Sequence, residues 1–246
     1  MLLHDRYELG ALLGSGGAGA VFAARDVLRC DQVALKRISV VTERDRDEVR
    51  REYVALHLAR LTGVVRVRDL FDGPWDVAGA ATSAIEPTLA DLGDVEAPGP
   101  GLRAMWLVME RVEGQPFGVG PWARIEAPAR QLMRTLAALH RRRLVHGDIK
   151  HANVIVSGGA ATLVDLGLSR REGAAGRFGF TLRYAAPEVR RGGRASIRGD
   201  LYALGATLYA SLRAGCLPTA GVPEEALLDP ELRDPPIPPL PPEVHR

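Results

Sequence analysis

The sequence predicts an α+β fold in two lobes, with an antiparallel sheet and one helix in the N-terminal lobe and mainly helices in the C-terminal lobe. Short apolar runs separated by glycines fill residues 7–40 and indicate strands. Helical spacing of apolar residues follows over residues 43–61, 128–143 and 200–212. The chain has 246 residues, of which 46% are hydrophobic and 25% are charged, and this length suffices for one large core or two small lobes.

The sheet of the first lobe is expected to begin with three strands, at residues 7–13, 20–24 and 32–38. A glycine-rich connection at residues 14–19 separates the first two runs, which favours antiparallel neighbours. Two later apolar runs, residues 64–71 and 105–109, predict further strands.

Residues 43–61 are predicted to form the helix of this lobe. Val49, Tyr53 and Leu56 fall on one helical face, and charged residues fill the first turns. Residues 72–103 are rich in Gly, Ala, Pro, Asp and Glu. Their apolar residues follow neither the helical nor the strand spacing, so this segment is expected to be a surface insertion.

The second lobe is expected to open with a helix over residues 128–143, whose leucines are spaced for one buried face. Short strands around residues 154–156 and 162–164 follow it. Residues 200–212 are apolar enough for a buried helix.

One short run carries most of the predicted chemistry. Residues 146–154 read His-Gly-Asp-Ile-Lys-His-Ala-Asn-Val, and Asp165 follows twelve residues after Asn153. Asp148 could accept the proton of an attacking hydroxyl, and Lys150 could approach a γ-phosphate. Asn153 and Asp165 offer hard oxygen ligands for Mg²⁺. The alternative is that Asp148 and Asn153 only close turns, as these residue types often do.

A glycine-rich run precedes the first helix. Gly14, Gly16, Gly19 and Val21 fit the pattern GxGxxGxV, in which backbone N–H groups can close over phosphates without obstruction by side chains. A dinucleotide-binding fingerprint has the same glycine spacing but opens a helix. Strand-like residues follow here, so a hairpin over a nucleotide is the preferred interpretation, and a flexible glycine linker is the alternative.

A lysine interrupts an otherwise apolar strand. Lys36 needs a route to solvent or an anionic partner, and Glu52, sixteen residues later in the predicted helix, is the candidate partner. Together they could hold the α- and β-phosphates of a nucleotide. Alternatively, Lys36 reaches solvent through its long side chain and Glu52 is one more solvated charge.

Taken in order along the chain, these motifs resemble those of the eukaryotic-type protein kinase family, and the resemblance runs from about residue 7 to residue 212. The composition, rich in alanine and arginine, is similar to that of bacterial serine/threonine kinases of this type. The matching segments are the glycine-rich run, Val33-Ala34-Leu35-Lys36, the run at 146–154, Asp165-Leu166-Gly167, Ala186-Pro187-Glu188 and Asp200-Leu201-Tyr202-Ala203-Leu204-Gly205.

The resemblance implies a protein kinase that uses ATP and Mg²⁺ to phosphorylate a protein. Its N-lobe would cover residues 1–112, with the insertion at about 72–103, and its C-lobe residues 113–217. Residues 218–246 would be a proline-rich tail or the truncated remainder of a shortened C-lobe.

The resemblance also implies how adenine is bound. Met109 takes the place of the gatekeeper residue beside the adenine ring. The Glu110 carbonyl and the Val112 amide would form hydrogen bonds with the adenine edge. The side chains of Val21, Ala34 and Ile155 would sandwich the ring, although these apolar residues fit a plain core equally well.

The acceptor class follows from the same resemblance. Lys150 and Thr181 are typical of serine/threonine kinases, so the expected acceptor is a protein Ser or Thr hydroxyl, and Thr181 would bridge Asp148 and Lys150. Gly147 stands where the family often has an arginine that binds a phosphate on the activation loop. The only hydroxyl between Gly167 and Thr181 is that of Ser169, so we expect this loop to become ordered without phosphorylation.

The C-terminal part departs from the family pattern. Nine prolines lie between Pro218 and Pro242, which favours an extended linker or tail over packed helices. Family members continue with further helices and an arginine that pairs with the glutamate equivalent to Glu188. A buried, unpaired Glu188 would be costly, so we expect either a missing segment or a partner that completes the C-lobe.

Composition excludes several other classes. The net charge is +2, from 32 basic and 30 acidic residues that are scattered, so no basic stripe predicts binding to nucleic acid. No apolar run reaches the roughly eighteen residues that a membrane span needs. The chain has two distant cysteines, Cys30 and Cys216, which favours a reducing compartment and a cytoplasmic location.

Two other functions fit parts of the sequence. A pseudokinase scaffold would bind nucleotide without turnover; the intact catalytic residues argue against it and the shortened C-lobe for it. Small-molecule phosphotransferases also carry a His-Gly-Asp segment followed by asparagine, but they generally lack motifs like Ala186-Pro187-Glu188.

Overall fold

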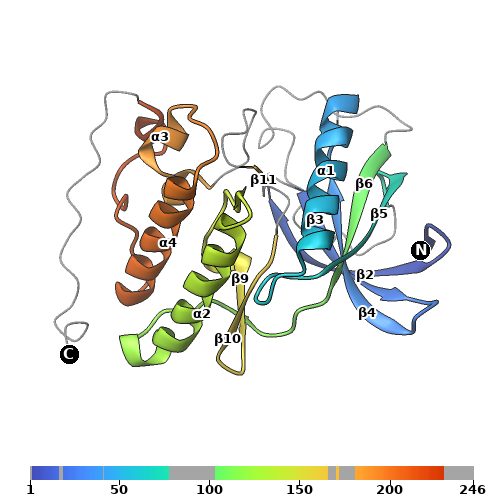
Figure 1. Cartoon of the computed structure of the whole chain (residues 1–246), viewed down its shortest axis with the longest axis horizontal. Coiled ribbons are helices and arrows are strands. Elements are labelled where there is room, and N and C mark those ends of the chain that lie inside the picture. The colour runs from blue at the N-terminus through green and yellow to red at the C-terminus, as the bar shows by residue number, and fades with distance from the viewer. Residues whose placement is uncertain are drawn as a thin grey trace. The chain divides into compact units, whose positions relative to one another are not determined.

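A computed structural model describes residues 2–16, 19–40, 42–77, 103–165, 170–171 and 181–229. The chain divides into two compact units (Figure 1). The first comprises Met1–Arg60 and Arg66–Arg111, and the second comprises Leu61–Val65 and Val112–Arg246. The division after Arg111 lies one residue before the boundary predicted at residue 112.

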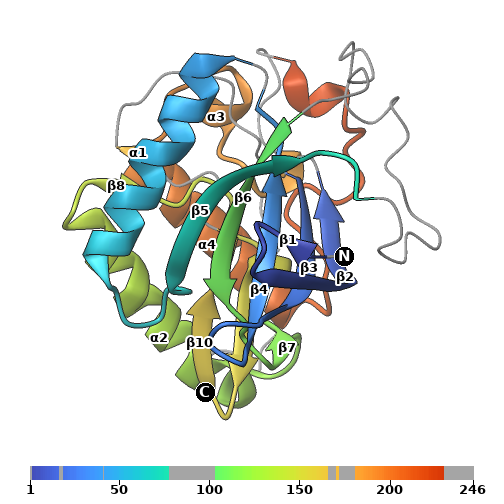
Figure 2. The same ribbon diagram turned by 90° about the vertical axis from the view of Figure 1, so that its right-hand side faces the viewer.

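The first unit contains a six-stranded antiparallel sheet with the strand order β1-β2-β3-β4-β6-β5 (Figure 2). The antiparallel sheet expected from the sequence is therefore confirmed. Its strands are β1 (Leu2–Leu3), β2 (Tyr7–Gly16), β3 (Gly19–Asp26), β4 (Asp31–Ile38), β5 (Val67–Pro74) and β6 (Arg103–Glu110).

Alternating side chains of this sheet build its core. In β3 the even-numbered residues from Ala20 to Asp26 are buried, while the residues between them are more exposed. In β4, by contrast, Val33 to Lys36 are all buried, as expected for a strand inside the sheet. Trp106 of β6 is fully buried and contacts Phe22, with 5.8 Å between ring centroids.

Among the described residues of this unit, one helix accompanies the sheet: α1 (Glu43–Ala59), which packs beside β5 (Figure 2). Its start is fixed by a capping box, because the Thr42 hydroxyl accepts from the Asp45 amide and the Asp45 carboxylate accepts from the Thr42 amide. Its last residue is Ala59, two residues before the predicted end, because Arg60 has a left-handed backbone (φ 41°) that caps the helix.

The strand predicted at residues 64–71 begins later, at Val67, and continues to Pro74. Residues 61–65 instead belong to the second unit, where the Val65 amide donates to Leu163 O (2.8 Å) and the Leu163 amide donates to Gly63 O (2.8 Å). The predicted insertion is correspondingly shorter at its start, because residues 72–74 lie in β5. Most of it, residues 78–102, lies outside the described residues.

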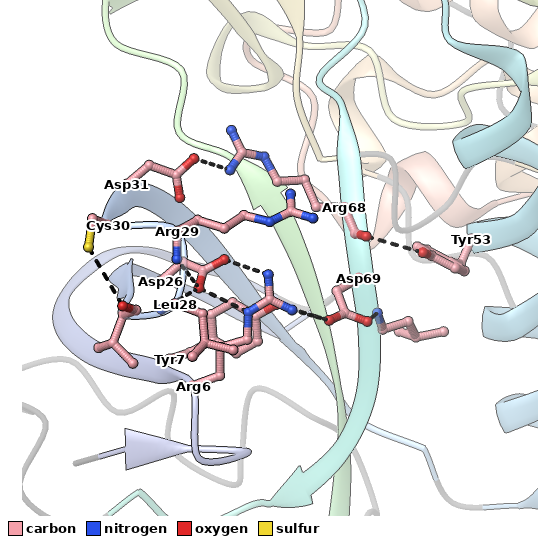
Figure 3. Close-up of polar contacts among 12 residues, drawn as sticks. Arg6, Tyr7, Asp26, Leu28, Arg29, Cys30, Asp31, Tyr53, Arg68 and Asp69 are labelled. Carbon is pink, nitrogen blue, oxygen red and sulfur yellow. Dashed lines mark hydrogen bonds and ion pairs between the residues drawn. The ribbon is translucent and has the colours of Figure 1, made fainter.

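A polar network joins the start of the chain to the sheet (Figure 3). The Arg6 guanidinium donates to both carboxylate oxygens of buried Asp26, at 2.9 and 2.7 Å, and to Asp69 at 3.3 Å. The Tyr7 hydroxyl also donates to Asp69, at 2.9 Å. Burial, and then this hydrogen bond, raise the pKa of Tyr7.

In the second unit, α2 (Trp122–His140) starts six residues before the predicted helix. The prediction took Pro128 as a helix start, but Pro128 lies inside α2. The buried stripe begins at Ile125 and continues through Leu132 and Leu136. Burial of this longer stripe outweighs the one backbone hydrogen bond that a proline removes.

Helix α4 (Ile197–Leu212) of this unit packs beside α2 (Figure 1). It begins three residues before the prediction because the Ser196 hydroxyl accepts from the Gly199 amide and caps the helix. The remaining elements are β7 (Gln115–Pro116), β8 (Leu144–Val145), β9 (Val154–Ser157), β10 (Ala160–Leu163), β11 (Arg170–Arg171) and α3 (Pro187–Arg190).

The first part of the predicted tail is packed, so an extended linker is wrong for residues 218–229. Arg183 donates to the carbonyls of Thr219 (3.1 Å) and Val222 (3.0 Å) and pairs with Glu224 (3.1 Å). Thr219 is 1% exposed. Proline content alone could not show these contacts, because they come from an arginine in a distant segment. Residues 230–246 lie outside the described part.

Candidate active site

A buried carboxylate of α4 fixes the backbone at the start of the predicted catalytic run. Asp200 accepts from the His146 amide through Oδ2 and from the Gly147 amide through Oδ1, both at 2.8 Å. His140, the last residue of α2, contacts Asp200 Oδ2 through Nε2 at 2.8 Å. Asp200 is 1% exposed, so these contacts satisfy a carboxylate that water does not reach.

His146 joins this backbone to the chain that leads to Asp165. Its ring is fully buried; Nδ1 accepts from the Asp148 amide (3.2 Å) and Nε2 contacts Val164 O (3.4 Å). The Val164 amide in turn donates to Asn153 O (2.9 Å). Asn153 and the residue preceding Asp165 are thereby held side by side.

Three groups surround the carboxylate of Asp148. Oδ1 accepts from the Thr181 amide (2.9 Å), and Oδ2 accepts from Asn153 Nδ2 (2.9 Å) and pairs with Lys150 Nζ (2.8 Å). Lys150 Nζ also donates to the Thr181 hydroxyl at 2.6 Å. Thr181 therefore contacts both Asp148 and Lys150, as the family resemblance implied.

The side-chain oxygens of Asn153 and Asp165 are ligands of the kind that a magnesium ion prefers. Asn153 Nδ2 donates to both the backbone oxygen and the carboxylate of Asp148, so the amide oxygen is the atom that it can offer to a cation. Asp165 adds a carboxylate and has a left-handed backbone, with φ 61°. Within the described ranges, no three His, Cys, Asp or Glu residues gather as a metal cluster. A divalent ion here would thus depend on one amide, one carboxylate and oxygens of a substrate.

The glycine-rich run forms a hairpin between β2 and β3, in which Gly14 pairs with Val21 and Gly16 pairs with Gly19. It does not open a helix, so the dinucleotide-binding alternative is wrong. Gly19 has φ 124°, and a Cβ atom there would lie 2.0 Å from Arg37 O. Residues 17–18, the tip of the run, are outside the described part.

Lys36 lies in β4 with 1% of its surface exposed, and Val21 is its register partner on β3. Glu52 lies on α1, half-buried, with its Oε1 atom buried. Both residues belong to the first unit, which is the arrangement that their predicted pairing requires. The pairing itself remains a prediction.

The residues expected around adenine are distributed over both units. Ala34 and Met109 are buried register partners on β4 and β6, and Glu110 ends β6. Val112 and Ile155 belong to the second unit, Ile155 as a half-buried residue of β9. Their contacts with a nucleotide remain predictions.

Two expectations concern regulation and completeness. Gly147 has a left-handed backbone, φ 85°, which a glycine adopts more readily than the arginine common in the family. Ser169 and most of the loop before Thr181 lie outside the described residues. Glu188 is exposed on α3, so the expected cost of burying it does not arise.

The sequence reasoning missed several residues of this site. His140 contacts Asp200, His151 contacts Tyr184 and Ser211, and neither histidine was assigned a role. A histidine at the end of an amphipathic helix, and a second one inside the catalytic run, were the only signals.

The fold is that of a protein kinase. The family model described as "Protein kinase domain" matches residues 7–234, and the chain belongs to this family. The resemblance and the α+β kinase fold predicted from the sequence are confirmed.

Similar proteins carry serine/threonine kinase names. The DNA damage-responsive serine/threonine-protein kinase RqkA of Deinococcus radiodurans is 36% identical over 237 residues, covering 92% of this chain and 32% of that protein. The probable serine/threonine-protein kinase PknB of Corynebacterium glutamicum is 29% identical over 257 residues, covering 97% of this chain and 36% of that protein. The chain thus spans about a third of the length of these curated relatives. Among the described residues, no helix has both the length and the apolar content needed to cross a lipid bilayer.

Proposed function

We propose that this chain is a serine/threonine protein kinase that transfers the γ-phosphoryl group of ATP, with Mg²⁺, to a hydroxyl of a protein substrate. One observation supports this most directly. The carboxylate of Asp148 is held by Thr181, Asn153 and Lys150, and the same lysine binds the Thr181 hydroxyl. This arrangement fixes a proton acceptor next to a cation, as phosphoryl transfer to an alcohol needs.

In this proposal, Asp148 orients the acceptor hydroxyl and takes its proton at a carboxylate oxygen. Lys150 offsets the negative charge of the γ-phosphoryl group while its contact with Thr181 keeps it in place. Asn153 and Asp165 would hold Mg²⁺, which neutralises charge on the phosphate oxygens when it is bound. Asp200 and His146 hold the backbone that carries these groups.

The first unit would supply the nucleotide contacts. Backbone amides of the hairpin at Gly14, Gly16 and Gly19 would cover the phosphates, while Lys36 and Glu52 would hold the α- and β-phosphates. The adenine contacts would come from Val21, Ala34, Glu110, Val112 and Ile155.

Location is part of the proposal. Cys30 and Cys216 are both free and exposed, which suits the reducing conditions of the cytoplasm. A partner or further segment that completes the second unit stays a prediction.

The test is transfer of radiolabelled phosphate from ATP to a generic basic protein, followed by identification of the labelled amino acid. We expect phosphoserine or phosphothreonine, and a loss of at least about a thousandfold in Asp148→Asn, which removes the proton acceptor and a charge. Asp47→Asn, an exposed aspartate of α1, is the matched control and should retain the wild-type rate.

The pseudokinase scaffold predicts a different result. It would bind ATP with an affinity that Asp148→Asn leaves unchanged, and wild-type protein would transfer no phosphate. Labelling of an aminoglycoside, with none on protein, would instead favour a small-molecule phosphotransferase.

A further inference from the structure

His151 uses both ring nitrogens to join three segments of the second unit. It begins the 3-10 helix His151–Asn153, directly after Lys150. Nδ1 lies 3.0 Å from the Tyr184 hydroxyl, and Nε2 lies 2.9 Å from Ser211 Oγ on α4. The rings of His151 and Tyr184 meet edge to face, with 6.0 Å between centroids.

These bonds have one consistent direction. Ser211 donates its single hydroxyl hydrogen to Thr207 O at 3.0 Å, so its oxygen must accept from the Nε2–H of His151. In the neutral ring with its proton on Nε2, Nδ1 accepts a hydrogen bond from the Tyr184 hydroxyl. The resulting chain runs from Tyr184 through His151 and Ser211 to Thr207.

Tyr184 connects this chain to the groups around Asp148. It ends the 3-10 helix Leu182–Tyr184, and its amide donates to Thr181 O at 2.9 Å. Thr181 in turn contacts both Asp148 and Lys150. The catalytic run and the segment at 181–184 are therefore linked twice, once at Thr181 and once at His151.

We propose that His151 is a positioning residue that holds the catalytic run in register with the segment at 181–184 and with α4. This inference rests on the proposed kinase activity, because the two linked segments carry Asp148, Lys150 and Thr181. A displacement of about 1 Å between such groups is enough to slow a reaction strongly.

A double-mutant cycle tests this role. Tyr184→Phe removes only the hydroxyl, and we expect it to lower kcat for protein phosphorylation about tenfold with little change in KM for ATP. In a His151→Leu background, Tyr184→Phe should lower kcat by less than about twofold, because its partner is already gone. His151→Asn places an acceptor oxygen near the position of Nδ1, so the tenfold effect of Tyr184→Phe should return.

Equal effects of Tyr184→Phe in all three backgrounds would overturn the proposal. His57→Leu, which removes a half-buried histidine of α1 that contacts only Val67 O among the described hydrogen bonds, is the control and should leave kcat unchanged. Circular dichroism of each variant identifies any that fail to fold.

A second measurement needs no variant and no activity. Nitrogen NMR of the histidine rings in the wild-type protein should show His151 with its proton on Nε2 and none on Nδ1. A proton on Nδ1 would contradict the hydrogen-bond chain. If this NMR signature is found but wild-type protein transfers no phosphate, the proposed activity fails while the geometry of His151 stands. Absence of transfer would thus leave His151 without a catalytic segment to position and would overturn its proposed role.

Discussion

Asp148 and Lys150 form an ion pair of 2.8 Å, although the expected tasks of the two side chains differ, one toward a hydroxyl and the other toward a phosphate. Thr181 contacts both, through its amide to Asp148 and its hydroxyl to Lys150. These three contacts form a closed set, so a change in one member should disturb the other two.

The Thr181 hydroxyl is expected to matter more than its methyl group. Thr181→Val keeps the shape of the side chain and the hydrogen bond from the backbone N–H to Asp148, but it removes the hydroxyl that accepts from Lys150. Phosphate transfer should therefore fall about tenfold to a hundredfold. Thr181→Ser keeps that acceptor and should stay within about threefold of the wild-type rate. Initial rates at saturating ATP make the comparison, and equal rates for the two variants would show that the hydroxyl has no role.

Asp200 should be essential for stability, whereas Glu188 should not. Asp200→Asn replaces one of two accepting oxygens with an N–H donor that faces a backbone amide, and should lower the free energy of unfolding by about 2–4 kcal/mol. Glu188→Gln changes an exposed side chain and should have an effect within about 0.5 kcal/mol. Urea unfolding of both variants gives the comparison. A large loss for Glu188→Gln would restore the expectation that this glutamate needs a buried partner.

The two ends of the glycine hairpin should respond differently to alanine. A Cβ atom on Gly19 would lie 2.0 Å from Arg37 O and φ is positive, so Gly19→Ala should destabilise the first unit by about 1–3 kcal/mol. A Cβ atom on Gly14 meets nothing within 4 Å, so Gly14→Ala should be neutral or slightly stabilising. Thermal unfolding of both variants distinguishes them, and similar losses at both positions would contradict the hairpin geometry.

The spacing of apolar residues predicted those strands and helices whose buried side chains recur at regular intervals along the chain. The start of α2 was missed because Pro128 was taken as the first helical residue, a position that proline often occupies, while the buried apolar stripe extends back to Ile125. The start of β5 was misplaced because the apolar residues Val64 and Val65 belong to the second unit, where they pair with Leu163, whereas β5 belongs to the first unit. Periodicity cannot tell which core a residue enters.

The site shows the same limit. The residue types and spacing of Asp148, Lys150 and Asn153 predicted a group that the structure brings together. The contacts of His140 with Asp200 and of His151 with Ser211 were not predicted, and in each case the partners are 60 positions apart. Tertiary packing creates these bonds, and no motif of adjacent residues records them.

Arg183 is predicted to hold the packed part of the C-terminal segment. Arg183→Gln removes the ion pair with Glu224 and the hydrogen bonds to the carbonyls of Thr219 and Val222. Residues 218–229 should then be cut at protease concentrations that leave the wild-type protein intact. Mass spectrometry of the fragments locates the cut. Arg130→Gln, which breaks an exposed i,i+4 pair with Glu126, is the control and should be cut like wild type.

The pair of Arg6 and Asp26 should make stability depend on pH on the acid side. The hydrogen bonds from Arg6 lower the pKa of Asp26 below its ordinary value of 3.8. Because the carboxylate binds protons more weakly in the folded state, its contribution is complete above the unfolded pKa and is lost as the pH falls through the lower, folded pKa. Asp26→Asn should therefore be less stable than wild type at pH 7, with a difference that shrinks below about pH 4.

Urea unfolding of both proteins between pH 7 and strong acid measures this difference in stability. Glu8→Gln, which changes an exposed side chain, is the control and should differ little from wild type at pH 7. A gap between wild type and Asp26→Asn that stays constant into strong acid would mean that the guanidinium of Arg6 does not stabilise the charged form of this carboxylate.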